Sequence, residues 1–319
     1  MNTTYTAKDI EVLEGLEPVR KRPSMYIGGV DSHGYHHLLW EVVDNSVDEA
    51  INGYAKKIEV VLDADLMGAT VTDDGRGIPV DMHPKFKRSA LELVLCTLHS
   101  GGKFGNSSYH VAGGLHGVGD SVVNALSGEL TATVRRDGRE YTQSYRRGDP
   151  TTKLVKGEST NKHGTTVHFR PDPQIFGDKL KFDAELVRER LEAKSYLHKG
   201  LRIVFLDRAT GDQVEFDHPG GINDYLVKLV GDKKKPSVHP QPFFFERANG
   251  HSRVEIALQW TEATDETIRT YANGIPTGSG GTHESGFKQG LVKAIRGYMV
   301  SKNLSPKGAA FHQNILEFR

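Results

Sequence analysis

The sequence EVVDNSVDEA, residues 41–50, combines an apolar and a polar helical pattern. Apolar side chains recur at a spacing near 3.6 residues, at Leu39, Val43, Val47 and Ala50. This spacing predicts a helix over 36–51 with one buried face. His37, Glu41 and Asn45 are four residues apart and share another face. A polar face is most often the solvated side of a surface helix, but a carboxylate one turn from an amide can also polarise a water and hold a cation.

A second stretch, DDGRGIP at 73–79, follows an expected strand over 69–72. Asp-Gly is common in tight turns, so a turn is the simplest interpretation. A carboxylate fixed at a strand end can also accept a hydrogen bond from an exocyclic amine. Gly77 would let a flat ring lie against the backbone. Adenine fits this description, as do other ligands.

A third stretch, GGLHGVG at 113–119, leads into an expected helix over 120–127. Successive backbone N–H groups at a helix start favour a polyphosphate, whereas a flexible hinge is the alternative. The glycine order differs from the dinucleotide motif, and no G-x-x-x-x-G-K-[ST] motif occurs. Lys103 lies upstream and would add a positive charge.

Length and composition limit the number of domains and the classes of protein to which this sequence can belong. The 319 residues are enough for two domains, and DHPGG at 217–221 suggests a boundary, giving 1–218 and 219–319. The 41 basic and 41 acidic residues cancel, so bulk charge predicts neither nucleic-acid nor membrane binding. There is no apolar run of about 18 residues, and the single Cys96 cannot form an internal disulfide. We expect a cytoplasmic protein.

The order of these motifs is more specific than any one of them. Glu-x-x-x-Asn, Asp-x-Gly-x-Gly, a glycine loop before a helix, and GTT at 164–166 follow one another. In this order the sequence resembles the GHKL ATPase superfamily and, more closely, the B subunits of bacterial type IIA topoisomerases. VRKRP at 19–23 and LHSGGKF at 98–104 add to a similarity that runs from about residue 8 to 308.

The resemblance implies an α+β fold. Residues 1–218 would form a Bergerat (GHKL) sandwich, one mixed sheet covered by helices, with 1–14 as an N-terminal dimerisation arm. Residues 219–319 would form a partial ribosomal-S5-like α/β transducer domain.

The resemblance also implies roles for single residues. Glu41 would be the general base, supported by His37, and Asn45 the protein ligand of Mg²⁺. The adenine contacts would come from Asp73, Thr165, Gly77, Ile78, Pro79 and Arg76, with Arg76 paired to Glu49. The triphosphate contacts would come from Gly101, Gly102, Lys103, Tyr109, Gly114, Leu115, His116, Gly117, Val118 and Gly119. Tyr5 would cross to a second protomer.

By the same resemblance, the function is Mg²⁺-dependent ATP binding and hydrolysis that closes a dimer gate in a type II DNA topoisomerase. The partners would be a second copy of the chain, the A subunit and a DNA segment, with no membrane. Aminocoumarin-type inhibitors would bind near Asp73 and Arg136. The loop 103–113 favours topoisomerase IV over gyrase, whereas other GHKL enzymes and a passive DNA-binding protein fit less well.

Two departures from the family pattern bear on activity. Asp120 replaces a small or apolar residue. It would either point into solvent or repel the phosphates by on the order of 1 kcal/mol, which would weaken ATP binding. The match also fades after residue 308, before the loop that carries the transducer lysine, and no DNA-cleavage domain follows. We therefore expect slow or negligible hydrolysis by this chain alone, with ATP binding retained. The alternative function is a truncated, nucleotide-gated dimerisation module.

Overall fold

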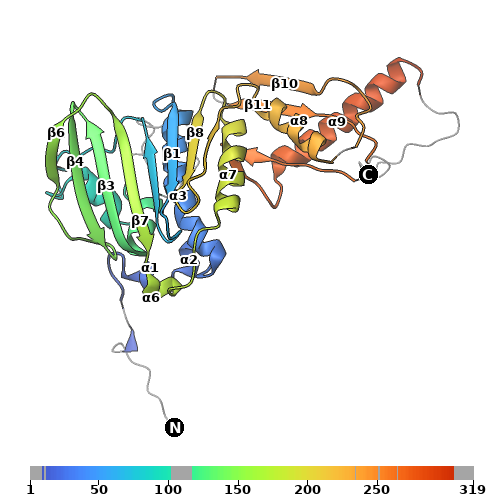
Figure 1. The fold of residues 1–319 in the computed structure, drawn as a ribbon. Coiled ribbons are helices and arrows are strands. Elements are labelled where there is room, and N and C mark those ends of the chain that lie inside the picture. The colour runs from blue at the N-terminus through green and yellow to red at the C-terminus, as the bar shows by residue number, and fades with distance from the viewer. Residues whose placement is uncertain are drawn as a thin grey trace, which may run out of the picture. The chain divides into compact units, whose positions relative to one another are not determined.

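The computed structural model describes residues 9–304, apart from 11, 102–116, 234, 251 and 264. The chain divides into two compact units, Met1–Gly221 and Ile222–Arg319, which are described separately (Figure 1).

The described part of the first unit contains a nine-stranded sheet. Its strands are β1 (Lys57–Leu62), β2 (Ala69–Asp73), β3 (Ser127–Arg136), β4 (Arg139–Arg146), β5 (Asp149–Pro150), β6 (Val155–Ser159), β7 (Gly164–Pro171), β8 (Arg202–Asp207) and β9 (Gln213–Phe216). Their order is β5-β4-β3-β7-β2-β1-β8-β9, and β6 pairs with β4. Because β1 and β8 are parallel while the other pairs are antiparallel, the sheet is mixed, as expected.

Seven helices accompany this sheet in the described residues. They are α1 (Glu17–Lys21), α2 (Ser24–Ile27), α3 (Ser32–Ile51), α4 (Ala90–Cys96), α5 (Gly119–Ala125), α6 (Pro173–Phe176) and α7 (Ala184–Leu197). The two short helices α1 and α2 lie before the motif-bearing helix α3, in a stretch without a repeated apolar spacing. The helix expected over 120–127 ends at Ala125, and Ser127 begins β3.

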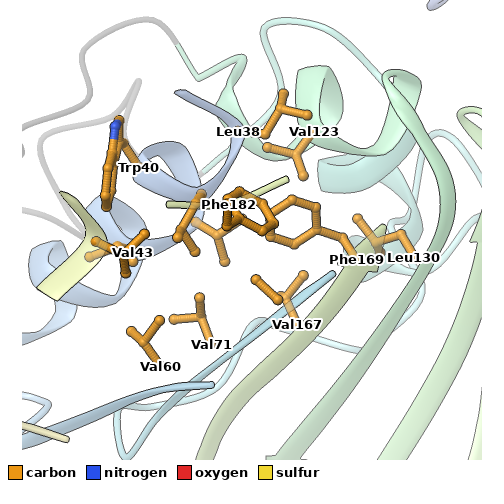
Figure 2. Packing of buried hydrophobic residues seen from close by; sticks show 14 of the residues in the cluster. Leu38, Trp40, Val43, Val60, Val71, Val123, Leu130, Val167, Phe169 and Phe182 are labelled. Carbon is orange, nitrogen blue, oxygen red and sulfur yellow. The ribbon is translucent and has the colours of Figure 1, made fainter. Parts of the chain in front are cut away.

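Alternation along the central strands creates one apolar and one polar sheet face. In β2, Ala69, Val71 and Asp73 are buried, while the two threonines between them are half-buried. The apolar face packs against α3 and α5, and Figure 2 shows helix residues such as Leu38 opposite strand residues such as Val167. This alternation places Asp73, a carboxylate, on the helix-covered face at the end of its strand.

The opposite face carries rows of hydroxyl groups. Cross-strand hydrogen bonds join Thr131 to Ser144 (3.0 Å), Thr133 to Thr142 (3.2 Å), and Thr72 to Thr166 (3.0 Å). These pairs fix the register of β3 with β4 and of β2 with β7. A turn at Asp137-Gly138 joins β3 to β4, and both of its residues have positive φ angles, 54° and 74°.

Gly164 is a point where two backbones approach closely. Its φ is +114°, and a Cβ there would lie 2.0 Å from the Asp73 carbonyl oxygen. We expect Gly164→Ala to lower the free energy of unfolding by about 2–4 kcal/mol, because the strained φ and the backbone clash add together. The control is Gly177→Ala, which has a φ of +75° but no atom within 4 Å of the new Cβ. It should lose only about 1–2 kcal/mol. Urea unfolding of both variants measures the difference, and equal losses would mean that the strands relax around the methyl group.

The second unit contains α8 (Ile222–Lys233), β10 (Phe243–Ala248), β11 (Arg253–Leu258), β12 (Tyr271–Ala272), β13 (Ile275–Pro276) and α9 (Thr282–Ser301). Strand β11 pairs with β10 in antiparallel register. Burial does not alternate along β11, since Val254 is 49% exposed and the next four residues are half-buried. Within the described residues, no helix is both long and apolar enough to cross a bilayer.

Candidate functional site

Asp73 is the most constrained polar side chain of the site. It is 7% exposed, and its carboxylate accepts hydrogen bonds from Gly75 N (2.9 Å), Thr165 N (3.2 Å) and Ser46 Oγ (3.1 Å). Burial raises the pKa of Asp73 to about 6, the three donors lower it, and the nearby Glu49 charge raises it further. Asp73 is thus a fixed acceptor that is ionised at neutral pH.

Residues from three segments surround this carboxylate. Ile78 N donates to Thr165 Oγ1 (3.3 Å), which ties the turn after β2 to β7. Gly77 has a φ of +75°, and a Cβ there would lie 3.0 Å from the Arg135 carbonyl oxygen. The Gly77 carbonyl accepts from Arg136 Nη1 (2.8 Å), whereas Pro79 is exposed.

Arg76 is held at the edge of this group. Its guanidinium forms a two-point ion pair with Glu49, with Nη2–Oε1 at 2.7 Å and Nε–Oε2 at 3.1 Å, so the expected pairing is confirmed. Its Cζ also lies 3.6 Å from the centroid of the Tyr54 ring. The ion pair and the ring contact together orient the side chain.

The polar face of α3 carries His37 and Glu41. His37 Nδ1 lies 3.6 Å from Glu41 Oε1, just beyond hydrogen-bond length. Burial lowers the pKa of His37, as do His33 and Arg190, while Asp44 opposes them. His37 is therefore mainly neutral at pH 7, so its contact with Glu41 is not an ion pair.

Asn45 lies one turn further along α3 and contacts α5. Its Nδ2 donates to Asp120 Oδ1 at 2.8 Å. Asp120 is half-buried on the first turn of α5, so the expectation that it points into solvent is wrong. An acid is stable in this position because it meets the positive end of the helix dipole.

The start of α5 approaches Glu41 as well. A Cβ at Gly119 would lie 2.3 Å from Glu41 Oε2, so only glycine fits there without movement of the glutamate. Gly117 has a φ of +59°, and Val118 is the N-cap of α5. The structure thus brings Glu41, Asn45 and the residues 117–120 together.

Several expected site residues are not placed in this group. Gly101 is described, but a Cβ there would meet no atom within 4 Å. The others lie outside the described residues: Tyr5, Gly102, Lys103, Tyr109, Gly114, Leu115 and His116. The loop 103–113 is also outside them, so the preference for topoisomerase IV stays a prediction.

Sequence reasoning missed Ser46, Tyr54 and the contact made by Asp120. Ser46 carried a signal, since it falls on the apolar stripe of α3, where a hydroxyl group needs a buried partner. That partner is Asp73. Because Asn45 and Ser46 are adjacent, α3 links the Asp73 group to the Glu41 group.

The donor set fits a magnesium ion held mainly by oxygens of a ligand. Among the described residues, there is no group of three or more ligating His, Cys, Asp or Glu side chains. Asn45 offers an amide oxygen, and Asp120 adds a negative charge beside it. Mg²⁺ prefers oxygen ligands and often takes one protein side chain plus phosphates.

Two family models match this chain. A family model for histidine kinase-, DNA gyrase B- and HSP90-like ATPases matches residues 30–175. A DNA gyrase B model matches residues 221–317. The first match contains both parts of the site described above.

Curated relatives are identical to this chain at nearly half of the aligned positions. The DNA gyrase B protein of Enterococcus faecalis is 47% identical over 302 residues, which are 94% of this chain and 47% of the relative. The DNA gyrase B protein of Staphylococcus aureus is 45% identical over 303 residues, with the same coverage of 94% and 47%. The chain spans about half the length of the curated relatives it matches.

Two solved structures each match more than nine tenths of this chain. The 43K ATPase domain of Thermus thermophilus gyrase B, in complex with an aminocoumarin, is 40% identical with a TM-score of 0.79. The match covers 92% of this chain and 75% of that domain. The ATP-binding domain of Francisella tularensis topoisomerase IV, in complex with a small-molecule inhibitor, is 37% identical with a TM-score of 0.76, covering 93% and 77%. The chain therefore belongs to the gyrase B family of GHKL ATPases and corresponds to the ATPase region of the B-type subunits of bacterial type IIA topoisomerases.

Proposed function

We propose that this chain binds ATP with Mg²⁺ and hydrolyses it, with the adenine at Asp73 and the phosphates at the start of α5. The observation that carries the proposal is the buried Asp73 carboxylate. Burying a charge costs free energy unless hydrogen bonds compensate it, so a buried carboxylate is often kept for a function. The Asp73 carboxylate lies at the end of β2 on the helix-covered face of the sheet. The adenine amino group would donate to it, beside Thr165, Gly77, Ile78 and Pro79. Arg76 would lie over the base.

The start of α5 is where the phosphates of the nucleotide would bind. Backbone N–H groups at 117–119 suit phosphate oxygens, and the helix dipole favours their charge. Asn45 would hold the metal, which neutralises charge on the phosphates when bound. Gly101, Gly102, Lys103, Tyr109 and residues 114–116 would complete this cradle.

The chemical step would depend on Glu41. Its carboxylate would accept a proton from the attacking water, and neutral His37 would orient it through Nδ1. A contact of 3.6 Å in the ligand-free state can tighten when the reactants are in place. Phosphoryl transfer needs placement and charge neutralisation more than covalent help, which matches this set of groups.

The role of the whole protein is also a proposal. ATP would close a homodimer through the arm at 1–14, including Tyr5, around a DNA segment. With an A subunit, the complete enzyme would supercoil or decatenate DNA in the cytoplasm. Aminocoumarin-type inhibitors would overlap the base position near Asp73 and Arg136; the Thermus gyrase B complex supports binding of this inhibitor class.

The test is calorimetry with a non-hydrolysable ATP analogue, with and without Mg²⁺, beside phosphate release and sedimentation. We expect Mg²⁺-dependent association and a nucleotide-dependent dimer. Dimerisation without any phosphate release would favour the nucleotide-gated module instead. No heat of association in either buffer would reject ATP binding.

The raised pKa of Asp73 predicts how pH acts on binding. The adenine amino group needs the ionised carboxylate, so affinity for ATP should fall as the pH drops through about 6, by at most about tenfold per pH unit. Fluorescence or calorimetric titrations between pH 5 and 8 measure it. Purine riboside triphosphate lacks the amino group and is the control. An equal pH dependence for both nucleotides would assign the effect to another group.

A further inference from the structure

Asp120 and Asn45 form a pair that links the first turn of α5 to the polar face of α3. The Asn45 Nδ2 to Asp120 Oδ1 distance is 2.8 Å, which is a good hydrogen bond to a charged acceptor. The contact joins residues 75 positions apart in the chain. It therefore depends on how α5 packs against α3.

The chemistry of the pair fixes the orientation of the Asn45 amide. An ionised carboxylate only accepts hydrogen bonds, so the amide nitrogen must face Asp120. The amide oxygen, on the other branch of the same group, is then turned away from Asp120. An acceptor beside the nitrogen selects one of two amide orientations that would otherwise be similar in energy.

Asn45 lies on the same face of α3 as Glu41, the proposed general base. Glu41 is one helical turn before Asn45, and a Cβ at Gly119 would lie 2.3 Å from Glu41 Oε2. The residue that orients Asn45 thus follows directly after the glycine that faces Glu41.

We propose that Asp120 is a positioning residue that makes nucleotide binding depend more strongly on the metal. It holds the Asn45 amide with its oxygen presented to Mg²⁺, and its negative charge adds to the attraction for the cation. Without a metal, the same charge repels the phosphates. The proposal rests on the proposed function, because it needs a Mg–nucleotide complex at this site.

Asp120 should strengthen nucleotide binding when Mg²⁺ is present and weaken it when Mg²⁺ is absent, so the two effects can be measured separately. The variants are Asp120→Ala, which removes the carboxylate, and Asp120→Asn, which keeps a polar group that can face Asn45 either way. The control is Asp178→Ala, which removes one exposed acid after α6. Each protein is titrated with the non-hydrolysable analogue in Mg²⁺ and in EDTA.

We expect Asp120→Ala to bind the analogue about 10-fold more weakly in Mg²⁺, the usual scale for loss of a residue that orients a metal ligand. In EDTA its affinity should be unchanged or higher. The dissociation constant in EDTA divided by that in Mg²⁺ should therefore fall by about 10-fold or more. For Asp120→Asn this ratio should lie between those of Asp120→Ala and the wild type. For Asp178→Ala it should equal the wild-type ratio.

Other results would overturn the proposal. Equal weakening in both buffers would mean that Asp120 only supports packing, and an unchanged ratio would make it a bystander. Tighter binding in both buffers would mean that repulsion of the phosphates dominates. If the wild type bound no nucleotide in either buffer, the proposed function itself would fail, which is a different outcome from any of these.

Discussion

Glu41→Gln should reduce ATP turnover by about 10²–10⁴-fold and leave affinity for the Mg–nucleotide complex within a few-fold of the wild type. Glutamine keeps the size of the side chain and its place beside Gly119, but it cannot accept a proton from water. Only an interaction made during the reaction is lost, so kcat should fall while binding persists. Phosphate release and calorimetry on the same preparation measure the two quantities.

A matched control for this variant is Glu59→Gln on β1. Its side chain is 43% exposed and pairs with Lys57 at 3.2 Å, on a strand away from α5. Turnover should not change there. If Glu41→Gln turned over ATP at the wild-type rate, the base would be another group. If it lost binding and turnover in parallel, Glu41 would be a ligand-positioning side chain instead.

The first helix of the site shows what the sequence could predict. The apolar stripe and the polar face of residues 36–51 appear together in α3, which begins four residues earlier, at Ser32. Alternation in β2 likewise places Asp73 on the covered face. Both predictions depend on short-range periodicity, which is strong in long elements that bury one side.

The failures come from elements without periodicity and from contacts between elements. Helices α1 and α2 have five and four residues, too few to repeat an apolar spacing. They are held by tertiary contacts instead: Arg20 of α1 binds Asp172, near the start of α6, at 2.7 Å. The direction of Asp120 is a similar case, since it follows from the packing of α5 on α3 and not from its neighbours in sequence.

The resemblance to a family predicted roles for the site residues but not the side chains that hold those residues in place. It predicted the Arg76–Glu49 pair, which the structure contains. Ser46 donating to Asp73 and Tyr54 under Arg76 were not predicted. These two residues do not act on a ligand in our proposal, and they hold the residues that would.

Asp73→Asn should lower affinity for ATP by about 10²–10³-fold, the largest effect on binding that we expect from one substitution. The variant replaces a charged acceptor by an N–H donor where the adenine amino group, also a donor, would lie. Losing a hydrogen bond to a charged group and leaving a donor unsatisfied cost about 3–4 kcal/mol together. Calorimetry with the non-hydrolysable analogue measures the loss.

The same substitution should not unfold the protein. The asparagine oxygen can still accept from Gly75 N and Thr165 N, and its nitrogen can donate to Ser46 Oγ. Burial raises the pKa of Asp73 from 3.8 to about 6, which means that the charged form is disfavoured in the folded state. Removing that charge should keep or increase the free energy of unfolding at pH 7, by up to about 3 kcal/mol.

Substitution of the adjacent acid, Asp74, should have the opposite effects on stability and on ATP affinity. Asp74 accepts from Lys56 N (2.7 Å) and Lys57 N (2.8 Å), so it holds the start of β1 and faces no proposed ligand atom. Asp74→Asn should lower stability by about 1 kcal/mol and leave ATP affinity unchanged. A crossed pattern, with affinity lost at 73 and stability lost at 74, requires a base that contacts Asp73 directly. If Asp73→Asn lost stability and affinity together, the buried carboxylate would be a structural group, and the adenine would have to bind elsewhere.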